Sequence, residues 1–568
     1  MNNLFSEQLM SEQCPSVQKR RGDHVEGFSL EKIEKAVSAA FTEVQQPVSV
    51  DRVTQIALLV KTKILMAHSG VVSVEDIQDL VESTLMEIGA VEVAKSYILY
   101  RSKREGIRDA RLVPDPTAIS DYIHPAKYSR YLAEEKRRET YKETVARVEA
   151  MHLKKFPLAA KEITEAFDFV RGKKVLPSMR SMQFAGEAIE SINARQFNCC
   201  FLLLDKMRAF KDTLYLLLCG SGVGYSVQYD HVDKLPKLKH VDEKNVVHHT
   251  VADTIEGWAN ALDKLMMSYV RGYYVEFNFS KVRAEGAPLK TSGGKAPGHL
   301  DLKKALENIR SILDDAQGRQ LRPIECYDIQ CFAADAVLSG GIRRSATIAL
   351  FSLEDGEMMA AKTGDWFPKY PWRANSNNSA VLKRGEVNKR QFKRVFKCIK
   401  EFGEPGFVFV NDYDHGFNPC VEISLNPVLV VDDYVMATIE RKRAEGQFIP
   451  KTKLGDVHTG TAFCNLTEIN AAACKTPGDL YEAARMASRI GTLQAAYTSF
   501  PYLGWVSEII AEREALIGVS MTGMKDSPLV SLDPEVQTTA AGIVVCENAR
   551  FAAEIGISQA ARTTCVKP

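Results

Sequence analysis

The feature that most constrains the fold is a change of sequence pattern near Val175. Beyond this point, short apolar runs of strand length alternate with helical stretches, and glycine and proline separate them. Five such runs read CCFLLL, YSVQY, YVEFNF, ATIALFSL and GFVFVND. Alternating strands and helices predict an α/β domain, and the length of the region favours a barrel with inward-pointing loops over a simple doubly wound sheet.

The region before this domain has the apolar spacing of helices. Apolar residues recur at helical intervals after Ser29, and two more amphipathic stretches follow at 50–68 and 74–105. Ser29 is a candidate N-cap of the first helix, and Ser73 is a candidate N-cap of the last. Residues 106–174 are charged and helical in pattern, so we expect them to connect a small helical unit to the α/β domain.

Composition bounds the cellular setting and excludes several classes of protein. The net charge is +1, which gives no global field that favours nucleic acid or an anionic membrane. No apolar stretch is long enough for a membrane helix, and no secretory signal opens the chain. The twelve cysteines are scattered without a CxxC pair, so neither a metal site nor a disulfide framework is indicated. We therefore expect a cytoplasmic protein whose cysteines are mostly buried apolar residues.

The stretch that carries the clearest chemistry is FNPCVEISL, at residues 417–425. Pro419 stiffens the backbone before Cys420 and biases Asn418 toward extended geometry. Cys420 and Glu422 are two residues apart, so in an extended segment their side chains point to one side. A thiol, a carboxylate and an amide would then surround one small space. A buried cysteine beside a surface loop is the alternative interpretation of the same residues.

The pattern Asn-Pro-Cys-x-Glu resembles the catalytic loop of ribonucleotide reductases, and further motifs follow in the order of that family. They are LPS at 176–178, NC followed by FLLL at 198–204, the glycine-rich GSGVG at 220–224, SGGIRRS at 339–345, RANSNNS at 373–379, FCNLTE at 463–468 and IGVSMTG at 517–523. The resemblance implies a ribonucleotide reductase-type ten-stranded α/β barrel over residues 175–568, incomplete at its C-terminal end.

The resemblance also implies the catalytic roles. Cys420 becomes a transient thiyl radical that takes the 3′ hydrogen of a ribonucleotide, and Glu422 accepts the 3′-hydroxyl proton as a general base. Asn418 holds the sugar hydroxyls by hydrogen bonds. Cys199 donates the proton with which the 2′-hydroxyl leaves as water. Cys199 and Cys464 then supply two reducing equivalents and end as a disulfide.

Substrate contacts are implied at Ser178, Asn198 and Gly222. Of the two adjacent cysteines, Cys199 follows Asn198 as in the family. Cys200 would point to the opposite face of a strand, and we expect it in the core.

Two effector sites are implied as well. Residues 14–105 resemble an ATP cone, an overall-activity switch in which lysine and arginine pair with phosphates; a plain helical domain with a basic turn is the alternative. The implied positions are Lys19, Arg20, Glu26 and Lys32 in the cone, and Gly340, Gly341 and Arg343 in the loop that senses the effector and reads the base.

The subclass stays open between two radical sources. The chain resembles the monomeric adenosylcobalamin-dependent reductases in two ways: by an insertion before SKVRAEG at 280–286, and by the exact residues of GGIRRSA and NPCVEISL. This resemblance suggests ribonucleoside triphosphates as substrates. An ATP cone is less usual in that group. The alternative is a class I large subunit, which reduces diphosphates and takes its radical from a metal-containing small subunit. A third possibility is a nucleotide-binding fragment without turnover.

The end of the chain, RTTCVKP at 562–568, departs from the family. In the family this sequence continues directly into Ser-Gly-Thr, a tight turn whose backbone N–H groups cradle phosphate. We therefore expect a downstream polypeptide of the same enzyme, produced from a split or intein-interrupted gene. The other expected partners are nucleotide substrates, ATP and deoxynucleotide effectors, and a thioredoxin- or glutaredoxin-type reductant. We expect no direct binding to nucleic acid or membrane.

Overall fold

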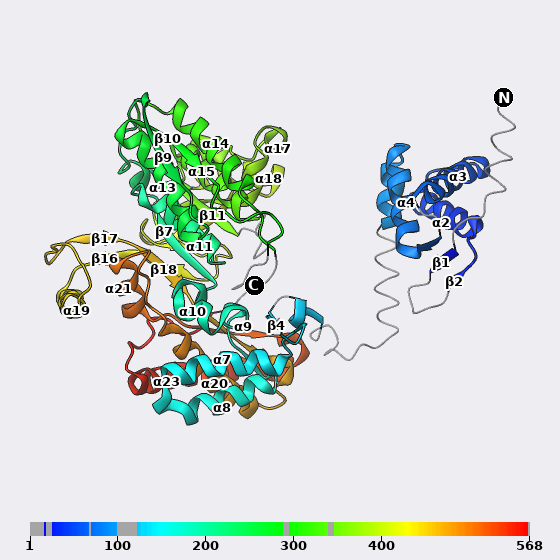
Figure 1. Ribbon diagram of the computed structural model, residues 1–568. Coiled ribbons are helices and arrows are strands. Elements are labelled where there is room, and N and C mark those ends of the chain that lie inside the picture. The colour runs from blue at the N-terminus through cyan, green and yellow to red at the C-terminus, as the bar shows by residue number, and fades with distance from the viewer. Residues whose placement is uncertain are drawn as a thin grey trace. The chain divides into compact units, whose positions relative to one another are not determined.

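The computed structural model describes residues 16–18, 25–67, 70–98, 122–126, 128–132, 134–287, 295–338 and 346–565. The chain divides into two compact units, residues 1–122 and residues 123–568 (Figure 1). The boundary falls within the region that the sequence predicted to be a connector. Each unit has a hydrophobic core of its own.

The N-terminal unit packs three helices with a small sheet. The helices are α2 (Leu30–Glu43), α3 (Val50–Ala67) and α4 (Val74–Glu87), and the strands are β1 (Ser16–Gln18), β2 (Val25–Glu26) and β3 (Val71–Ser73). β1 pairs antiparallel with β2 and parallel with β3. The sequence predicted helices alone, because strands of two or three residues are too short to show an alternating pattern.

The helix ends of this unit can be compared with the predicted caps. Ser73 forms a capping box with Asp76 at the start of α4, as its spacing predicted. Ser29 occupies the N-cap position of α2, but its side chain makes no capping hydrogen bond. The third predicted helix is interrupted, because α4 ends at Glu87 and Gly89 follows with a φ of +76°.

The larger unit opens with a hairpin and two helices. The hairpin consists of β4 (Tyr131–Leu132) and β5 (Arg137–Arg138), and the helices are α7 (Tyr141–Lys155) and α8 (Ala160–Arg171). The sequence predicted helical structure throughout this region, with no hairpin. A capping box between Thr140 and Glu143 starts the helix later instead, and Lys136, with a φ of +53°, lies in the preceding turn.

A six-stranded sheet forms the centre of this unit, in the order β13-β12-β11-β8-β7-β18. Its strands are β7 (Cys199–Leu203), β8 (Gly222–Ser226), β11 (Thr347–Ser352), β12 (Ser376–Lys383), β13 (Gly406–Val410) and β18 (Thr461–Cys464). Strands β7, β8, β11, β12 and β13 are parallel to one another, and β18 runs antiparallel to β7. A second sheet, β20-β19-β6, contains β6 (Val175–Leu176), β19 (Leu466–Asn470) and β20 (Gly518–Thr522).

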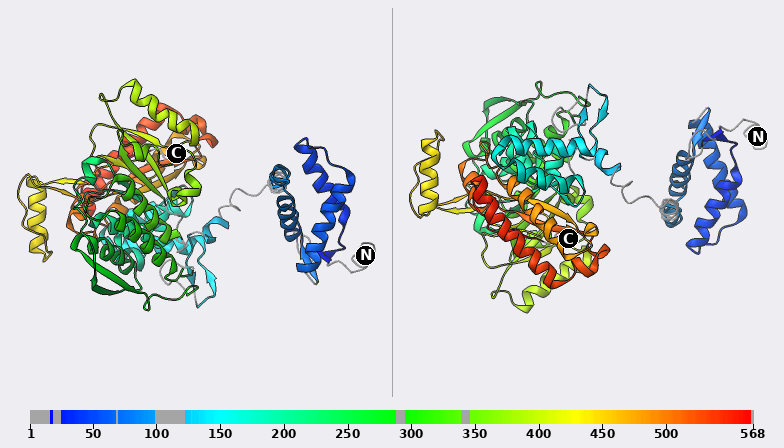
Figure 2. Two further views of the ribbon diagram at one scale, coloured as in Figure 1. Left: turned by 90° about the horizontal axis from the view of Figure 1, so that it is seen from above. Right: turned by 90° about the horizontal axis from the view of Figure 1, so that it is seen from below.

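The predicted α/β architecture is confirmed, and each of the five apolar runs contains or overlaps a strand. Closure into a ten-stranded barrel stays a prediction. Two small antiparallel pairs complete the central part: the hairpin of β14 (Gly416–Phe417) with β15 (Ser424–Leu425), and the pair of β16 (Val428–Val430) with β17 (Val457–Thr459). Between β16 and β17 lies α19 (Asp433–Ala444), and this arm projects from the unit in both views of Figure 2.

Helices α11 (Arg208–Leu218), α13 (Ile255–Arg271) and α15 (Pro323–Leu338) cover one face of the six-stranded sheet. The core on that face joins Cys200, Leu202 and Tyr225 of the sheet to residues of α11, α13 and α15. The remaining helices of the unit are α9 (Met179–Phe184), α10 (Glu187–Ser191), α12 (Tyr229–Val232), α14 (Leu300–Asp315), α16 (Gly356–Met359), α17 (Trp366–Lys369), α18 (Lys389–Phe402), α20 (Pro477–Ala495), α21 (Trp505–Glu514), α22 (Pro528–Ser531) and α23 (Pro534–Ile555). The inserted strands are β9 (Asp242–Thr250) and β10 (Tyr273–Asn278).

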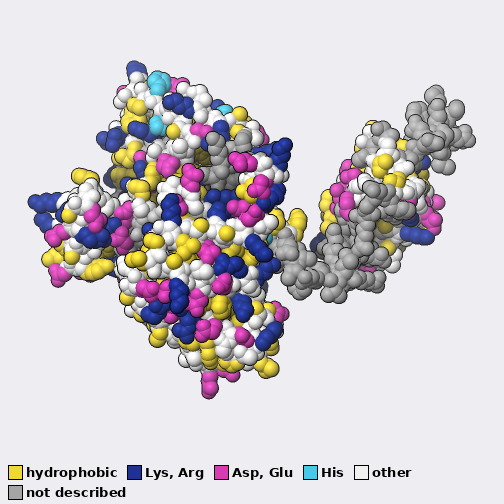
Figure 3. Space-filling model, turned by 60° about the horizontal axis from the view of Figure 1, so that its bottom comes forward, with side chains coloured by type: hydrophobic (Ala, Val, Ile, Leu, Met, Phe, Trp, Pro, Cys, Tyr) yellow, Lys and Arg dark blue, Asp and Glu magenta, His cyan; other side chains and the backbone are white. Residues whose placement is uncertain are grey.

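The surface carries charges of both signs. Lysine and arginine side chains are interspersed with aspartate and glutamate over the face drawn in Figure 3. Within the described residues, no helix is long and apolar enough to cross a membrane.

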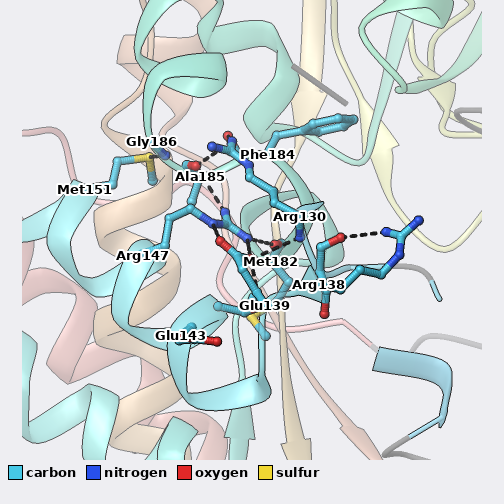
Figure 4. Close-up of polar contacts among 12 residues, drawn as sticks. Arg130, Arg138, Glu139, Glu143, Arg147, Met151, Met182, Phe184, Ala185 and Gly186 are labelled. Carbon is cyan, nitrogen blue, oxygen red and sulfur yellow. Dashed lines mark hydrogen bonds and ion pairs between the residues drawn. The ribbon is translucent and has the colours of Figure 1, made fainter. Parts of the chain in front are cut away.

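A buried ionic cluster fixes the carboxyl end of α9 (Figure 4). Glu139 accepts two hydrogen bonds from the guanidinium of Arg147, at 2.8 Å each. Arg147 also donates to the carbonyl oxygens of Met182 and Ala185, and Arg130 donates to those of Phe184 and Ala185. Carbonyl groups at a helix end lack helical partners, so these two arginines satisfy the end of α9.

Replacement of Glu139 by alanine is expected to lower the free energy of unfolding by about 3 kcal/mol at neutral pH, because Arg147 is left buried without its carboxylate. Burial raises the pKa of Glu139, but hydrogen bonds from Arg147, Arg130 and Thr144 outweigh burial and hold it below its ordinary value of 4.5. The stabilisation is therefore complete above that value and is lost as the pH falls through the lower folded pKa.

Denaturant unfolding of both proteins across this pH range measures the effect. The difference between wild type and Glu139→Ala should shrink below about pH 4. Glu135→Ala is the control in the neighbouring turn, since the ion pair between Glu135 and Arg137 is exposed, and a smaller loss is expected there. Equal losses at Glu139 and Glu135 would show that burial of the cluster contributes nothing.

Candidate active site

Two of the predicted cysteines face each other across adjacent strands. Cys199 begins β7 and Cys464 ends β18, and they are direct partners in the antiparallel register. Directly opposite residues in such a pair have Cα atoms about 4.5–5.5 Å apart, within the range that a disulfide spans. Both are buried, and both are thiols in this structure.

The two thiols share the face of the sheet opposite α11, α13 and α15. Along β7, Cys200 and Leu202 enter the core beneath those helices, whereas Phe201 and Leu203 enter the core of the opposite face. Side chains alternate along a strand, so Cys199 lies on the face of Phe201. On β18, Ala462 belongs to that same opposite core, which puts Cys464 on this face too. The sequence-based preference for Cys199 over Cys200 agrees with this arrangement.

The predicted radical loop is the turn of the β14–β15 hairpin. Within it, Ile423 N–H donates to Asn418 Oδ1 at 3.0 Å, and Val421 N–H donates to the Asn418 carbonyl at 2.9 Å. Val421 has a φ of +66°, in the left-handed region that side chains rarely adopt. Asn418 thus holds a strained turn that contains Cys420 and Glu422.

This hairpin lies against β7 and β8, on the face that carries the two thiols. A Cβ atom at Gly416 would lie 1.9 Å from Cζ of Phe201 on β7. A Cβ atom at Gly224 on β8 would lie 2.0 Å from the Phe417 carbonyl oxygen. Phe417 and Leu425 of the hairpin join the same apolar cluster as Phe201. The hairpin therefore reaches the sheet only because glycine occupies both positions.

The stretch at 220–224, which resembled a glycine-rich turn, is mostly strand. Gly220, with a φ of +94°, ends the turn after α11, and β8 begins at Gly222. Gly224 has a packing cause, because a Cβ atom there would collide with the hairpin. Gly222 is the register partner of Cys199 on β7. The sequence motifs did not predict the close packing at Gly224 or at Gly416, because each of these contacts joins segments that are distant in sequence.

The groups in the hairpin turn differ in exposure. Cys420 is exposed, Glu422 is half-buried and Asn418 is completely buried. The Nδ2 of Asn418 is buried and has no hydrogen-bond partner within the described part of the chain. A buried amide donor without a partner is unusual. It suits a group that donates a hydrogen bond to a hydroxyl of a bound ligand.

The predicted substrate contacts lie beside these strands. Asn198 directly precedes Cys199, and its carbonyl accepts the N–H of Gly222 at 2.8 Å. Ser178 is the N-cap of α9, and its hydroxyl accepts from Ser181 N–H at 3.0 Å. All three predicted contacts are buried.

The predicted effector residues are only partly described. Lys19, Arg20, Gly340, Gly341 and Arg343 lie outside the described residues. In the N-terminal unit, Lys32 donates to Glu26 Oε1 at 2.5 Å across an exposed ion pair.

Three further cysteines behave as core residues. Burial raises the pKa of Cys219 to about 12, and burial also raises the pKa values of Cys326 and Cys331 well above the ordinary range. Such thiols stay protonated and unreactive. No group of three or more His, Cys, Asp or Glu side chains that could hold a metal ion occurs among the residues described.

Comparisons with known proteins bear on this geometry. Residues 15–106 match the family model of the ATP cone domain. The chain is 24% identical over 501 residues to an adenosylcobalamin-dependent ribonucleoside-triphosphate reductase of Levilactobacillus brevis, covering 72% of this chain and 62% of that protein. The protein of the same description from Lactobacillus leichmannii is 24% identical over 485 residues, with the same coverage.

A solved structure gives the same indication for the fold. A crystal structure of a B12-dependent (class II) ribonucleotide reductase matches with a TM-score of 0.63 at 20% identity, over 78% of this chain and 72% of that chain. This likeness confirms the predicted fold family, and the family model confirms the ATP cone. The chain spans 62% of the length of these curated relatives.

Proposed function

We propose that this chain, whose fold is that of a class II ribonucleotide reductase, carries the thiol chemistry of an enzyme that reduces ribonucleoside triphosphates to 2′-deoxyribonucleotides in the cytoplasm. The observation that carries the proposal is the register of Cys199 opposite Cys464, beneath a hairpin whose turn contains Cys420. The choice of triphosphate follows the description of the relatives.

The mechanism assigns one role to each group. Cys420, after losing its hydrogen atom, takes the 3′ hydrogen of the ribose, and Glu422 accepts the 3′-hydroxyl proton. Asn418, with its buried Nδ2 donor, holds the sugar hydroxyls. Cys199 protonates the departing 2′-hydroxyl, which leaves as water. Cys199 and Cys464 together give two electrons and two protons. Cys420 then returns the hydrogen atom to C3′ and Glu422 returns the proton to the 3′ oxygen, so the net result is one C–O bond broken, one C–H bond formed at C2′ and one disulfide formed.

Adenosylcobalamin is the proposed source of the radical: bound beside the exposed Cys420, it would supply the radical that removes the hydrogen atom of that thiol. The exposure of Cys420 fits a radical generator that reaches the sulfur from outside the sheet, whereas Cys199 and Cys464 are buried and fit a role as internal reductants. A separate metal-containing small subunit would fit the same exposure. The descriptions of the relatives favour adenosylcobalamin.

Nucleotide effectors are proposed at two places. The ATP cone is proposed to bind ATP or a deoxynucleotide near Glu26 and Lys32, together with Lys19 and Arg20. The loop with Gly340, Gly341 and Arg343 is proposed to read the effector beside the substrate base.

Two polypeptide partners complete the proposal. A thioredoxin- or glutaredoxin-type dithiol would regenerate the thiols after each turnover. A companion polypeptide would supply the part of the relatives' length that this chain does not span. An apolar cavity beside Thr564 and Cys565, lined by Val519, Met521 and Val544, is a candidate place for it to pack.

The proposal predicts that deoxyribonucleoside triphosphate forms only when adenosylcobalamin is present. The assay uses the purified full chain with a ribonucleoside triphosphate and dithiothreitol, with and without the cofactor, and with and without the companion polypeptide. Product that requires a metal-containing small subunit instead would favour a class I large subunit. A chain that binds nucleotides but forms no product under any of these conditions would contradict the proposal and favour a non-catalytic fragment.

A further inference from the structure

A buried chain of hydrogen bonds joins the strand end at Cys464 to the helix start at Ser178. Its centre is Gln494 on α20, which is completely buried. Gln494 Oε1 accepts from Ser178 N–H at 2.8 Å and from the hydroxyl of Ser181 at 3.0 Å. Its Nε2 donates to Asn465 Oδ1 at 2.7 Å and to the Leu466 carbonyl at 3.1 Å. The amide thus uses both donors and both acceptor positions.

One end of this chain fixes the position of Cys464. Asn465 directly follows Cys464 and separates β18 from β19. Its Nδ2 donates to the Gly491 carbonyl at 2.8 Å, and its own carbonyl accepts from Gly518 N–H at 2.7 Å. Both polar atoms of the Asn465 side chain are therefore bonded to α20. Gly491 accepts from Nδ2, and Gln494 donates to Oδ1.

The other end reaches the segment that leads to Cys199. Gln196 Nε2 donates to the Ser181 hydroxyl at 2.8 Å, and Gln196 lies three positions before Cys199. Gln196 and Ser181 are also completely buried. The network therefore spans from the residue after one thiol to the approach of the other, and it passes through the start of α9.

We propose that Gln494 is a positioning residue that keeps Cys464 in register with Cys199 and ties both strands to the Ser178 segment. This inference rests on the proposed function, which assigns these two thiols as the redox pair. A disulfide tolerates only a narrow range of Cα separations and torsion angles, so a shift at the end of β18 changes its stability. Loss of Gln494 also leaves buried groups on Asn465 and Ser178 without partners, which drives such a shift.

The test measures the thiol–disulfide equilibrium of the full chain, without turnover. The reduced protein is equilibrated with glutathione and its disulfide, where one glutathione disulfide oxidises two protein thiols and yields two glutathione molecules. Acid quenching, alkylation and peptide mass spectrometry then give the fraction of Cys199–Cys464 disulfide. The variants are Gln494→Leu, which removes all four hydrogen bonds, and the near-isosteric Gln494→Glu, which removes the donors to Asn465 and Leu466.

Thr492→Val is the matched control. Thr492 is equally buried on α20, donates to the Ser488 carbonyl at 2.7 Å and accepts from Asn548 at 2.9 Å, so these hydrogen bonds join α20 to α23 and not to a cysteine strand. Thermal unfolding of all variants reports any general loss of stability. A merely structural role for Gln494 would move unfolding in all three variants and would move the disulfide equilibrium equally in all three.

We expect the equilibrium constant for the Cys199–Cys464 disulfide to fall by about tenfold or more in both Gln494 variants and to stay at the wild-type value in Thr492→Val. If Gln494→Leu does not fold, Gln494→Glu decides. Wild-type behaviour of the Gln494 variants, or an equal shift in the control, overturns the inference while leaving the redox pair intact. Absence of this disulfide in the wild-type protein instead overturns the proposed redox pair, and the role of Gln494 with it.

Discussion

Replacing Cys420 with alanine is expected to abolish deoxyribonucleotide formation, lowering turnover by at least about 10³-fold. The proposed chemistry begins with a hydrogen atom taken by the sulfur of Cys420, and no other described group in the hairpin turn offers a sulfur. ATP binding by the N-terminal unit should be unchanged, because that unit is compact in itself. Product analysis gives the first quantity, and calorimetric titration with ATP gives the second.

The control for this substitution is Cys546→Ala. Cys546 is also exposed, but it lies on α23, whose buried residues belong to a different core cluster from that of Phe201 and the hairpin. It should retain wild-type turnover. Normal turnover by Cys420→Ala would show that the hairpin thiol takes no part in the reaction. Equal losses of turnover at both positions would indicate that loss of any exposed thiol damages the enzyme.

Replacing Gly224 with alanine is expected to reduce turnover by about 10²-fold. A Cβ atom there would lie 2.0 Å from the carbonyl oxygen of Phe417, and a backbone atom cannot move away as a flexible side chain can. The hairpin must therefore shift outward, and a displacement of about 1 Å at a reacting group is enough for a loss of this size. Steady-state kinetics measure the effect, with circular dichroism to verify that the chain is folded.

Gly542→Ala provides the matched control for that prediction. Gly542 lies within α23, and a Cβ atom added to it would meet nothing within 4 Å. Alanine also has a higher helix propensity than glycine, so this variant should be active and slightly more stable. If Gly224→Ala retained full turnover, the close contact between hairpin and sheet could not be what positions Cys420.

The sequence was sufficient to predict which of two adjacent cysteines lies on each face of one strand, while the catalytic roles of the site residues stay predictions. Alternation along a strand predicts that Cys199 and Cys200 point to opposite faces, and Cys200 lies in the core beneath α11, α13 and α15. The direct register of Cys199 with Cys464 was beyond sequence reasoning. These residues are far apart in the chain, and register depends on the packing of both strands rather than on either one.

Other features had too little local signal. The strands of the N-terminal unit are two or three residues long, so no alternation could distinguish them from loops. The turn at Lys136 lies in a charged stretch that reads equally well as helix, and only the capping box at Thr140 indicates the later start. No sequence pattern marks Gln494, since its four hydrogen bonds join α20 to two other segments that are distant in sequence.

The most direct test of the central claim is a turnover experiment without external reductant. The reduced protein, with any companion polypeptide it requires, receives adenosylcobalamin and a ribonucleoside triphosphate, and deoxynucleotide and protein disulfides are then counted together. The account predicts one Cys199–Cys464 disulfide for each deoxynucleotide formed. Deoxynucleotide formed while Cys199 and Cys464 both remain thiols would contradict it.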